Sequence, residues 1–184
     1  MKKNGKIIIY LDRQKLTLLA TDIAQPLILE FPQSIIFDLE VIDPDGLNNL
    51  LYTWFEKNNI LPSQTIIVLS SDVYFSKLVP TTNDANLRKQ QEDQFLSTIP
   101  HKNIFIKEYV TSTNINLLGI SREFYEPFLR FLKRQNYEIL LIVPVFILDQ
   151  LKINLVEYSP KELTHIYSQE KILSSQSLIS GQEI

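Results

Sequence analysis

Two runs of apolar residues constrain the fold of this 184-residue chain more than any other feature of its sequence. The first spans residues 65–69, and the second spans residues 138–143, where only the leading glutamate is polar. A strand with one face in water alternates apolar and polar side chains, whereas a strand covered on both faces is apolar throughout. Both runs therefore predict covered strands of a sheet that has helices on its two faces, which is typical of the α/β class.

Two helices are predicted near these strands. The first begins after Asp43, a good N-cap, and has Pro44 in its first turn, where the missing N–H of proline costs nothing. Ser121 is expected to cap the second helix. Each helix carries one apolar stripe, made of Leu47, Leu50, Leu51, Trp54 and Phe55 in the first and of Phe124, Tyr125, Phe128, Leu129 and Leu132 in the second.

Short strands are predicted in the first forty residues. Residues 6–11 and 15–20 are apolar runs, and the polar break Asp12-Arg13-Gln14 between them predicts a tight hairpin. Residues 26–31 form a third run, which Pro32 ends.

From residue 73 to residue 143 the predicted elements follow the order strand, helix, strand, strand, helix, strand. This order is that of the ferredoxin-like arrangement, which consists of two split βαβ halves. We therefore expect a main lobe made of residues 1–72 and 145–170, an inserted ferredoxin-like subdomain at 73–144, and a flexible, serine-rich tail at 171–184. Within the main lobe, residues 145–151 predict a short helix, 154–158 a strand, and 160–167 a last helix or turn.

The residue types argue against several classes of function. Cysteine is absent, and neither of the two histidines, His101 and His165, has a second metal ligand near it in the sequence. Both histidines are expected to be solvated. The net charge of −3, with acidic and basic residues interspersed, argues against nucleic acid as a partner.

Lys2, Lys3 and Lys6 form the one basic cluster of the sequence. We interpret this cluster as a solubilising N-terminal segment, and weak attraction to an anionic membrane surface is the alternative. The apolar run that follows it is too short for a secretory signal or a membrane span. A cytoplasmic location is therefore expected.

Nucleotide chemistry is disfavoured by the scarcity of glycine. The four glycines are isolated from one another, whereas a loop that cradles phosphate needs several together, so that backbone N–H groups can approach the anion. The sequence contains neither G-x-G-x-x-G nor a P-loop, and nothing marks a nucleophile with a base beside it. We expect no enzymatic activity, no cofactor and no metal.

Several segments, taken in order, resemble one protein family. Residues 41–47, the helix after them, residues 65–75 and residues 77–80 resemble the N-terminal half of PilM-type proteins, the actin-like cytoplasmic components of type IV pilus assembly. This family is related to the cytoplasmic domain of the type II secretion L protein. Residues 96–100 close their helix as in the family, and the order of elements agrees as far as residue 151. The resemblance implies an actin-like (ribonuclease H-like) half domain with a mixed sheet, carrying the insert.

The resemblance also implies where a nucleotide would bind. In the family, the turn of the first hairpin begins with aspartate, contains glycine, leads to lysine and wraps phosphate. Asp12 and Lys15 match this pattern, but Arg13 and Gln14 place side chains where the backbone should approach the phosphate. The sequence also stops where the second lobe of the family should begin, so ATP hydrolysis is not expected.

The other function that the resemblance implies is binding of a partner. Family members bind the short cytoplasmic N-terminal segment of an inner-membrane pilus or secretion protein, in a groove between main lobe and insert. On this sequence the candidate contacts are Phe75, Lys77, Gln90, Gln91 and Gln94. The glutamines carry long amides that can bond an extended peptide backbone, and a solvated helix face is the alternative interpretation of them. A secretion motor ATPase is a further expected partner.

These expectations describe a non-catalytic cytoplasmic scaffold that reaches the inner membrane through its partner. The first alternative is one lobe of a nucleotide-binding actin-like ATPase. The second is an unrelated enzyme whose site is assembled from scattered residues, although no ionisable constellation stands out in the sequence.

Overall fold

The structure is a computed structural model that describes residues 5–21, 23, 25–153, 155 and 160–178. Its main element is a five-stranded sheet with the order β10-β6-β1-β2-β3. The strands are β1 (Lys6–Leu11), β2 (Lys15–Ala20), β3 (Leu27–Glu30), β6 (Gln64–Leu69) and β10 (Glu138–Pro144). The two covered strands predicted from the sequence are β6 and β10, and they lie next to each other.

The directions of the strands make this sheet mixed. β1 pairs antiparallel with β2, and β2 with β3, whereas β6 runs parallel to β1 and β10 runs parallel to β6. This is the strand order of an actin-like (ribonuclease H-like) half domain, so the expected α/β class and fold are confirmed. The register aligns Lys6 with Gln64 and Gln64 with Glu138, so the three parallel strands begin at one edge of the sheet.

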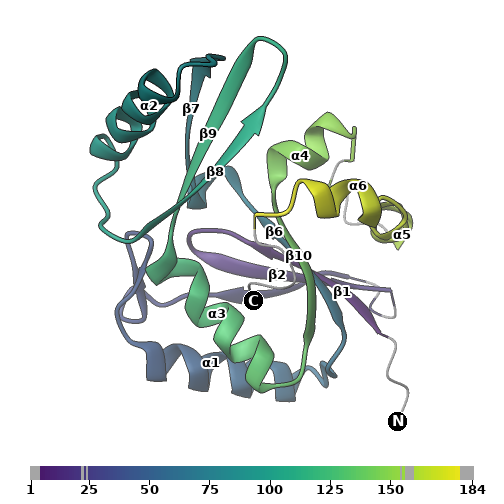
Figure 1. The fold of residues 1–184 in the computed structure, drawn as a ribbon. Coiled ribbons are helices and arrows are strands. Elements are labelled where there is room, and N and C mark those ends of the chain that lie inside the picture. The colour runs from purple at the N-terminus through teal and green to yellow at the C-terminus, as the bar shows by residue number, and fades with distance from the viewer. Residues whose placement is uncertain (1–4, 22, 24, 154, 156–159, 179–184) are drawn as a thin grey trace.

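Helices cover both faces of the main sheet (Figure 1). One face carries α1 (Pro44–Lys57) and α3 (Arg122–Arg134), and the other carries α5 (Pro160–Ser168) and α6 (Glu170–Ser175), with α4 (Val145–Gln150) at the carboxyl end of β10. On the α5 side, the Tyr167 hydroxyl donates hydrogen bonds to the carbonyls of Ile7 and Gln64, at 2.7 and 2.8 Å. Because both faces are covered, the central strands are apolar throughout.

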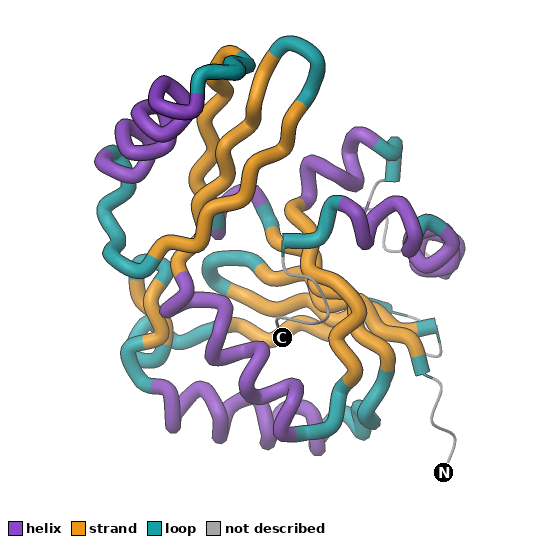
Figure 2. Tube along the Cα trace, in the orientation of Figure 1, coloured by secondary structure: helices purple, strands orange, loops and turns teal. Residues whose placement is uncertain are grey.

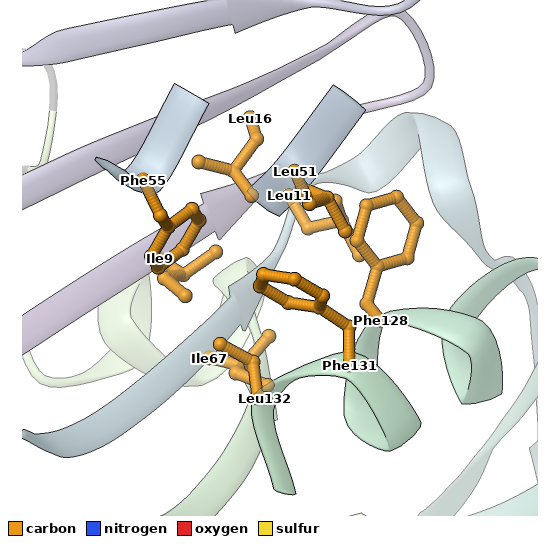
Figure 3. A pocket seen from close by; sticks show the side chains of 9 residues that line it. All are labelled: Ile9, Leu11, Leu16, Leu51, Phe55, Ile67, Phe128, Phe131 and Leu132. Carbon is orange, nitrogen blue, oxygen red and sulfur yellow. The ribbon is translucent and has the colours of Figure 1, made fainter. Parts of the chain in front are cut away.

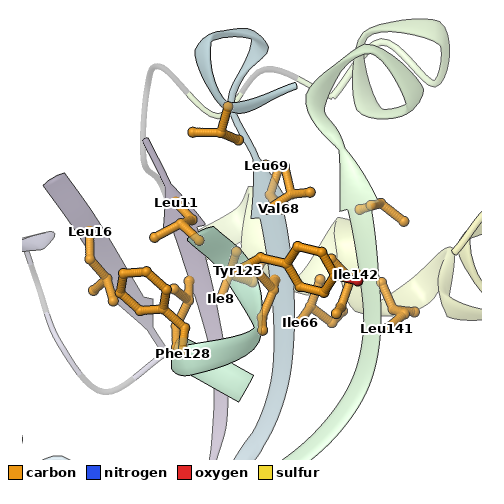
Figure 4. Packing of buried hydrophobic residues seen from close by; sticks show 14 of the residues in the cluster. Ile8, Leu11, Leu16, Ile66, Val68, Leu69, Tyr125, Phe128, Leu141 and Ile142 are labelled. Atoms are coloured by element: carbon orange, nitrogen blue, oxygen red, sulfur yellow. The ribbon is translucent and has the colours of Figure 1, made fainter. Parts of the chain in front are cut away.

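The core between the sheet, α1 and α3 is closely packed (Figures 3 and 4). It leaves a cavity of about 10 Å³, lined by Ile9, Leu11, Leu16, Leu51, Phe55, Ile67, Phe128, Phe131 and Leu132. A volume of this size holds at most one water molecule, and the apolar lining offers that water no hydrogen bond. This part of the molecule therefore supplies stability and no ligand site.

The first helix begins as predicted, and the second differs in one detail. Asp43 Oδ1 accepts a hydrogen bond from the Gly46 N–H at 2.9 Å, and Pro44 is the first helical residue. Ser121 occupies the N-cap position of α3, but its hydroxyl is buried and makes no hydrogen bond. The predicted side-chain cap of α3 is therefore wrong.

A second, three-stranded sheet lies above the main sheet in Figures 1 and 2. It consists of β7 (Phe75–Pro80), β9 (Asn114–Ser121) and β8 (Ile104–Val110), in that order and antiparallel, with α2 (Ala85–Ser97) on one face. The predicted order of elements between residues 73 and 143 is present. The ferredoxin-like arrangement predicted for 73–144 is wrong, because β10 pairs with β6 in the main sheet and α3 packs there too. We call β7, α2, β8 and β9 the insert.

The physical reason for this difference is that a continuous apolar run suits any strand with both faces covered. The small sheet has a single helix, α2, whereas the place beside β6 is covered on both faces. β10 takes that place, so the apolar side chains on both of its faces are buried in the larger sheet.

Residues 171–178 of the serine-rich tail are among the described residues. Residues 171–175 lie in α6, where Leu173 is buried, and Leu178 is buried beyond it. The Leu178 N–H donates to the Ile142 carbonyl of β10 at 2.8 Å. The prediction of a flexible tail is therefore wrong for residues 171–178, because apolar side chains anchor them, and residues 179–184 lie outside the described part. The strand predicted at 154–158 also falls largely on residues outside it.

Candidate functional site

In the turn between β1 and β2, the carboxylate of Asp12 occupies a backbone N–H group of the turn. The Gln14 N–H donates to the Asp12 carboxylate at 3.1 Å, and the Asp12 N–H donates to the Lys15 carbonyl at 2.9 Å. A phosphate at this turn would have to replace the Asp12 carboxylate as the acceptor of the Gln14 N–H. Asp12 and Lys15 are the positions that match the phosphate turn of the family. Their hydrogen bonds therefore pair backbone groups of the turn within the turn itself.

Arg13 reaches away from this turn to a second hairpin. That hairpin is formed by β4 (Ile36–Phe37) and β5 (Glu40–Val41), and the Arg13 guanidinium pairs with Asp38 at its tip. A cation that could have faced a phosphate is thus held by a carboxylate. Both side chains are about half exposed, so the pair fixes geometry more than it adds stability.

The tip of the second hairpin is strained. Asp38 and Leu39 have φ angles of 45° and 62°, a left-handed conformation that costs a residue with a Cβ about 1–2 kcal/mol. The Leu39 side chain is buried, and burial of a leucine contributes about 1.5–3 kcal/mol. Burial of Leu39 therefore holds Asp38 in reach of Arg13.

His101 does not occupy the solvated position expected for it. Its side chain is 5% exposed, its ring lies 5.7 Å from the Phe75 ring, and its Nδ1 lies 3.5 Å from Glu40 of the second hairpin. Nδ1 makes no hydrogen bond. The expectation fails because Phe75 of the insert and β5 of the main lobe enclose the loop that carries His101. His165 is exposed on α5.

The five predicted contact residues lie on two surfaces of the insert. Phe75 and Lys77 alternate with Ser76 and Leu78 on β7, and Phe75 packs into the small core beneath α2. The Gln91 amide donates to the Pro80 carbonyl at 3.4 Å, so Gln91 ties α2 to the end of β7. Gln90 and Gln94 point into solvent on the outer side of α2. The five residues do not converge on one groove.

The opposite face of the small sheet looks toward the main lobe. Tyr109 of β8 lies on this face, and its ring meets Phe146 of α4 at 5.1 Å, while Tyr74 meets the same Phe146 ring at 6.3 Å. The Tyr109 hydroxyl donates to the Gln176 carbonyl at 3.1 Å. Burial raises the pKa of Tyr109 and of Tyr74 above the ordinary phenol value.

Beside this aromatic junction the sheet is open to solvent. The register places Leu78 beside Asn116, and Asn116 beside Tyr109, while Ser76 lies on the same face. Leu78 is 65% exposed. Sequence reasoning missed this face, although the alternation of residues 104–110 and 75–80 could have shown which residues share it.

The described residues offer little for other chemistry. Among them, no group of three His, Asp or Glu side chains is placed to hold a metal ion. Within the same residues, none of the helices is both long enough and apolar enough to span a bilayer. Near the residues predicted from the sequence, the geometry offers an exposed sheet face and a closed hairpin turn.

The fold defines the class of this chain as an actin-like α/β half domain with an insert of three strands and one helix. No family model matches the sequence, and no curated protein matches it. Among solved structures, a PilM–PilN type IV pilus biogenesis complex is similar with 9% sequence identity and a TM-score of 0.49, over 74% of this chain and 46% of that chain.

Two further solved structures are similar to this chain. The cytoplasmic domain of EpsL, an inner-membrane component of the type II secretion system of Vibrio cholerae, has 11% identity and a TM-score of 0.46, over 77% of this chain and 57% of that chain. A Bacteroides thetaiotaomicron protein with an actin-like ATPase fold and unknown function has 13% identity and a TM-score of 0.42, over 75% of this chain and 52% of that chain. This chain spans about half the length of the three, and the likeness concerns the fold.

Proposed function

We propose that this protein is a non-catalytic cytoplasmic scaffold of a type IV pilus or type II secretion-like assembly platform. In this proposal it binds the cytoplasmic N-terminal segment of an inner-membrane partner and connects that partner to a secretion motor. The proposal rests on the sequence resemblance of the ordered segments between residues 6 and 151 and on the geometry of the first hairpin. Its location at the inner membrane follows from the partner.

The observation that carries the proposal is the closed turn at Asp12. A catalytic actin-like site needs N–H groups free to bind phosphate. Here the Gln14 N–H donates to Asp12, and Arg13 pairs with Asp38. Binding of a partner then needs no nucleotide.

The partner is placed on the insert, at the face of β7 that carries Ser76 and Leu78. β7 is an edge strand of the small sheet, with β9 as its one strand neighbour in the described part of the chain. An extended segment can add to such an edge through its main chain and place an apolar side chain against an exposed one. Leu78 is the exposed apolar residue at this place. Lys77 on β7 and Gln90 and Gln94 on α2 belong to the other side of the small sheet and define the alternative place for the partner.

Leu78→Asp is expected to weaken binding of the partner segment at least about 30-fold, because a charge would replace an apolar contact at the centre of the interface. The measurement is fluorescence anisotropy with a labelled peptide, taken from the cytoplasmic N-terminus of a candidate single-span inner-membrane pilus or secretion protein of the same organism. Val110→Asp is the matched control, since Val110 is similarly exposed, at 59%, but lies on the other edge strand and the other face. Unchanged binding by Leu78→Asp, with loss on Gln90→Ala or Gln94→Ala, would move the site to α2.

Calorimetric titration with Mg-ATP is expected to show no binding in the micromolar range. The reason is that the Gln14 N–H already donates to the Asp12 carboxylate and the Asp12 N–H to the Lys15 carbonyl. Micromolar affinity that Asp12→Ala or Arg13→Ala changes would overturn the proposal. Such a result would support the alternative, one lobe of a nucleotide-binding ATPase.

A further inference from the structure

One edge of the main sheet gathers several chain segments. β1, β6 and β10 begin there, as the register of Lys6, Gln64 and Glu138 shows. α1 ends at this edge with Lys57, and α3 ends there with Arg134, since both helices lead directly into the loops before β6 and β10. The insert lies at the opposite end of the molecule (Figure 1).

A groove of about 360 Å³ opens at this edge, between the ends of α1 and α3. Its floor is aromatic, because the Phe55 ring meets the Phe131 ring at 5.3 Å and the Tyr137 ring at 5.4 Å. The Tyr137 hydroxyl donates to the Ile60 carbonyl at 2.7 Å and holds the loop at the rim. From that loop Leu61 protrudes with 70% of its surface exposed.

Basic side chains lie in the last turns of the two helices that flank the groove. Lys57, Lys133 and Arg134 are exposed, and none of them forms an ion pair within the described part of the chain. Lys6 lies at the same edge, with its ammonium 4.6 Å from the centre of the Tyr167 ring. The acidic neighbours are Glu56, which accepts from Tyr52, Glu138, which accepts from Gln64, and Glu170, whose charge acts on Tyr167. The edge is therefore net positive in a chain whose net charge is −3.

We propose that this edge docks on the surface of an anionic lipid bilayer. Basic side chains and an exposed apolar residue at the same edge match the boundary between headgroups and acyl chains, where lysine and arginine meet anionic lipid and leucine enters the apolar layer. A nucleic-acid surface would gain from the basic residues but would leave Leu61 without an apolar partner. This proposal does not depend on the proposed function.

The orientation that results leaves the insert accessible. With the edge of Lys57 and Arg134 on the bilayer, β7 and α2 face away from the membrane, because they lie at the far end of the main sheet. A partner segment that has left the bilayer could still reach Leu78. Lipid binding and partner binding are therefore measurable independently of each other.

The test is co-sedimentation of the full chain with vesicles of phosphatidylcholine that contain one third phosphatidylglycerol. The triple variant Lys57→Gln, Lys133→Gln, Arg134→Gln is expected to lose on the order of 100-fold in affinity at low salt. The matched control Lys89→Gln, Lys102→Gln, Lys171→Gln changes the net charge equally at exposed positions elsewhere and is expected to bind like the unchanged chain. Raising the salt from about 0.05 M to about 0.5 M should weaken binding, since it shortens the screening length.

Leu61→Ser separates apolar docking from charge alone and is expected to lose about tenfold in affinity. The proposal would be overturned by equal binding to vesicles of phosphatidylcholine alone, by equal loss in both triple variants, or by no vesicle binding at low salt. Tighter binding to double-stranded DNA than to the anionic vesicles, unaffected by Leu61→Ser, would overturn it in favour of a nucleic-acid surface.

Discussion

Leu173→Ala is expected to lower the free energy of unfolding by about 2–5 kcal/mol, as truncation of a buried leucine does. Leu173 has 0% of its surface exposed, although it lies in the serine-rich segment that the sequence indicates as flexible. The loss is large because α6 and the residues after it pack on β10 through Leu173 and Leu178. Urea denaturation of both chains measures it.

Ile172→Ala is the matched control for this prediction. Ile172 is the neighbouring residue on the same helix, but it is 50% exposed, so its truncation is expected to change the stability by no more than about 0.5 kcal/mol. If both variants were equally stable to within this margin, the packing of α6 on the main sheet would be refuted.

Tyr109→Ala is expected to lower the free energy of unfolding by about 3–5 kcal/mol, the range for removal of a buried aromatic side chain. Tyr109 connects the insert to the main lobe, because its ring packs on Phe146 and its hydroxyl donates to the Gln176 carbonyl. Hydrogen exchange should show that β7, β8 and β9 lose protection before β1 and β6 do, since the variant releases the small sheet first.

Tyr109→Phe keeps the ring and removes only the hydrogen bond. Its expected cost is about 0.5–1.5 kcal/mol, the net contribution of one such bond. If Tyr109→Phe destabilised the protein as much as Tyr109→Ala, the hydrogen bond, and not the ring contact, would hold the insert to the main lobe. Uniform loss of protection in both sheets would show that the insert does not unfold separately.

Local signals in the sequence predicted most elements of this fold. Asp43 and Pro44 define the start of α1, and the stripe from Leu47 to Phe55 defines its buried face. The break at Asp12-Arg13-Gln14 likewise predicted the hairpin of β1 and β2. These features succeed because capping, turn formation and helical periodicity depend on residues close together in the chain.

Long-range packing decides what the sequence could not. The run at 138–143 predicts a covered strand. Its partner strand β6 is far away in the sequence, because paired residues such as Gln64 and Glu138 are 74 positions apart. His101 is enclosed by Phe75 and Glu40, which come from different parts of the chain. The candidate site fails to follow from the sequence for the same reason. Alternation gives the two faces of β7, but only the packing of Tyr109 on Phe146 shows which face meets the main lobe.

The contact of the last described residues with β10 has a consequence for solubility. β10 is an outer strand of the main sheet, and an outer strand with free backbone groups is a template for aggregation. Here the Ser177 hydroxyl accepts the Ile142 N–H, and the Leu178 N–H meets the Ile142 carbonyl. These two residues act as a cover for the most apolar border of the sheet. A chain shortened before Ser177 would expose that border and would be expected to self-associate while its helices and strands remain formed.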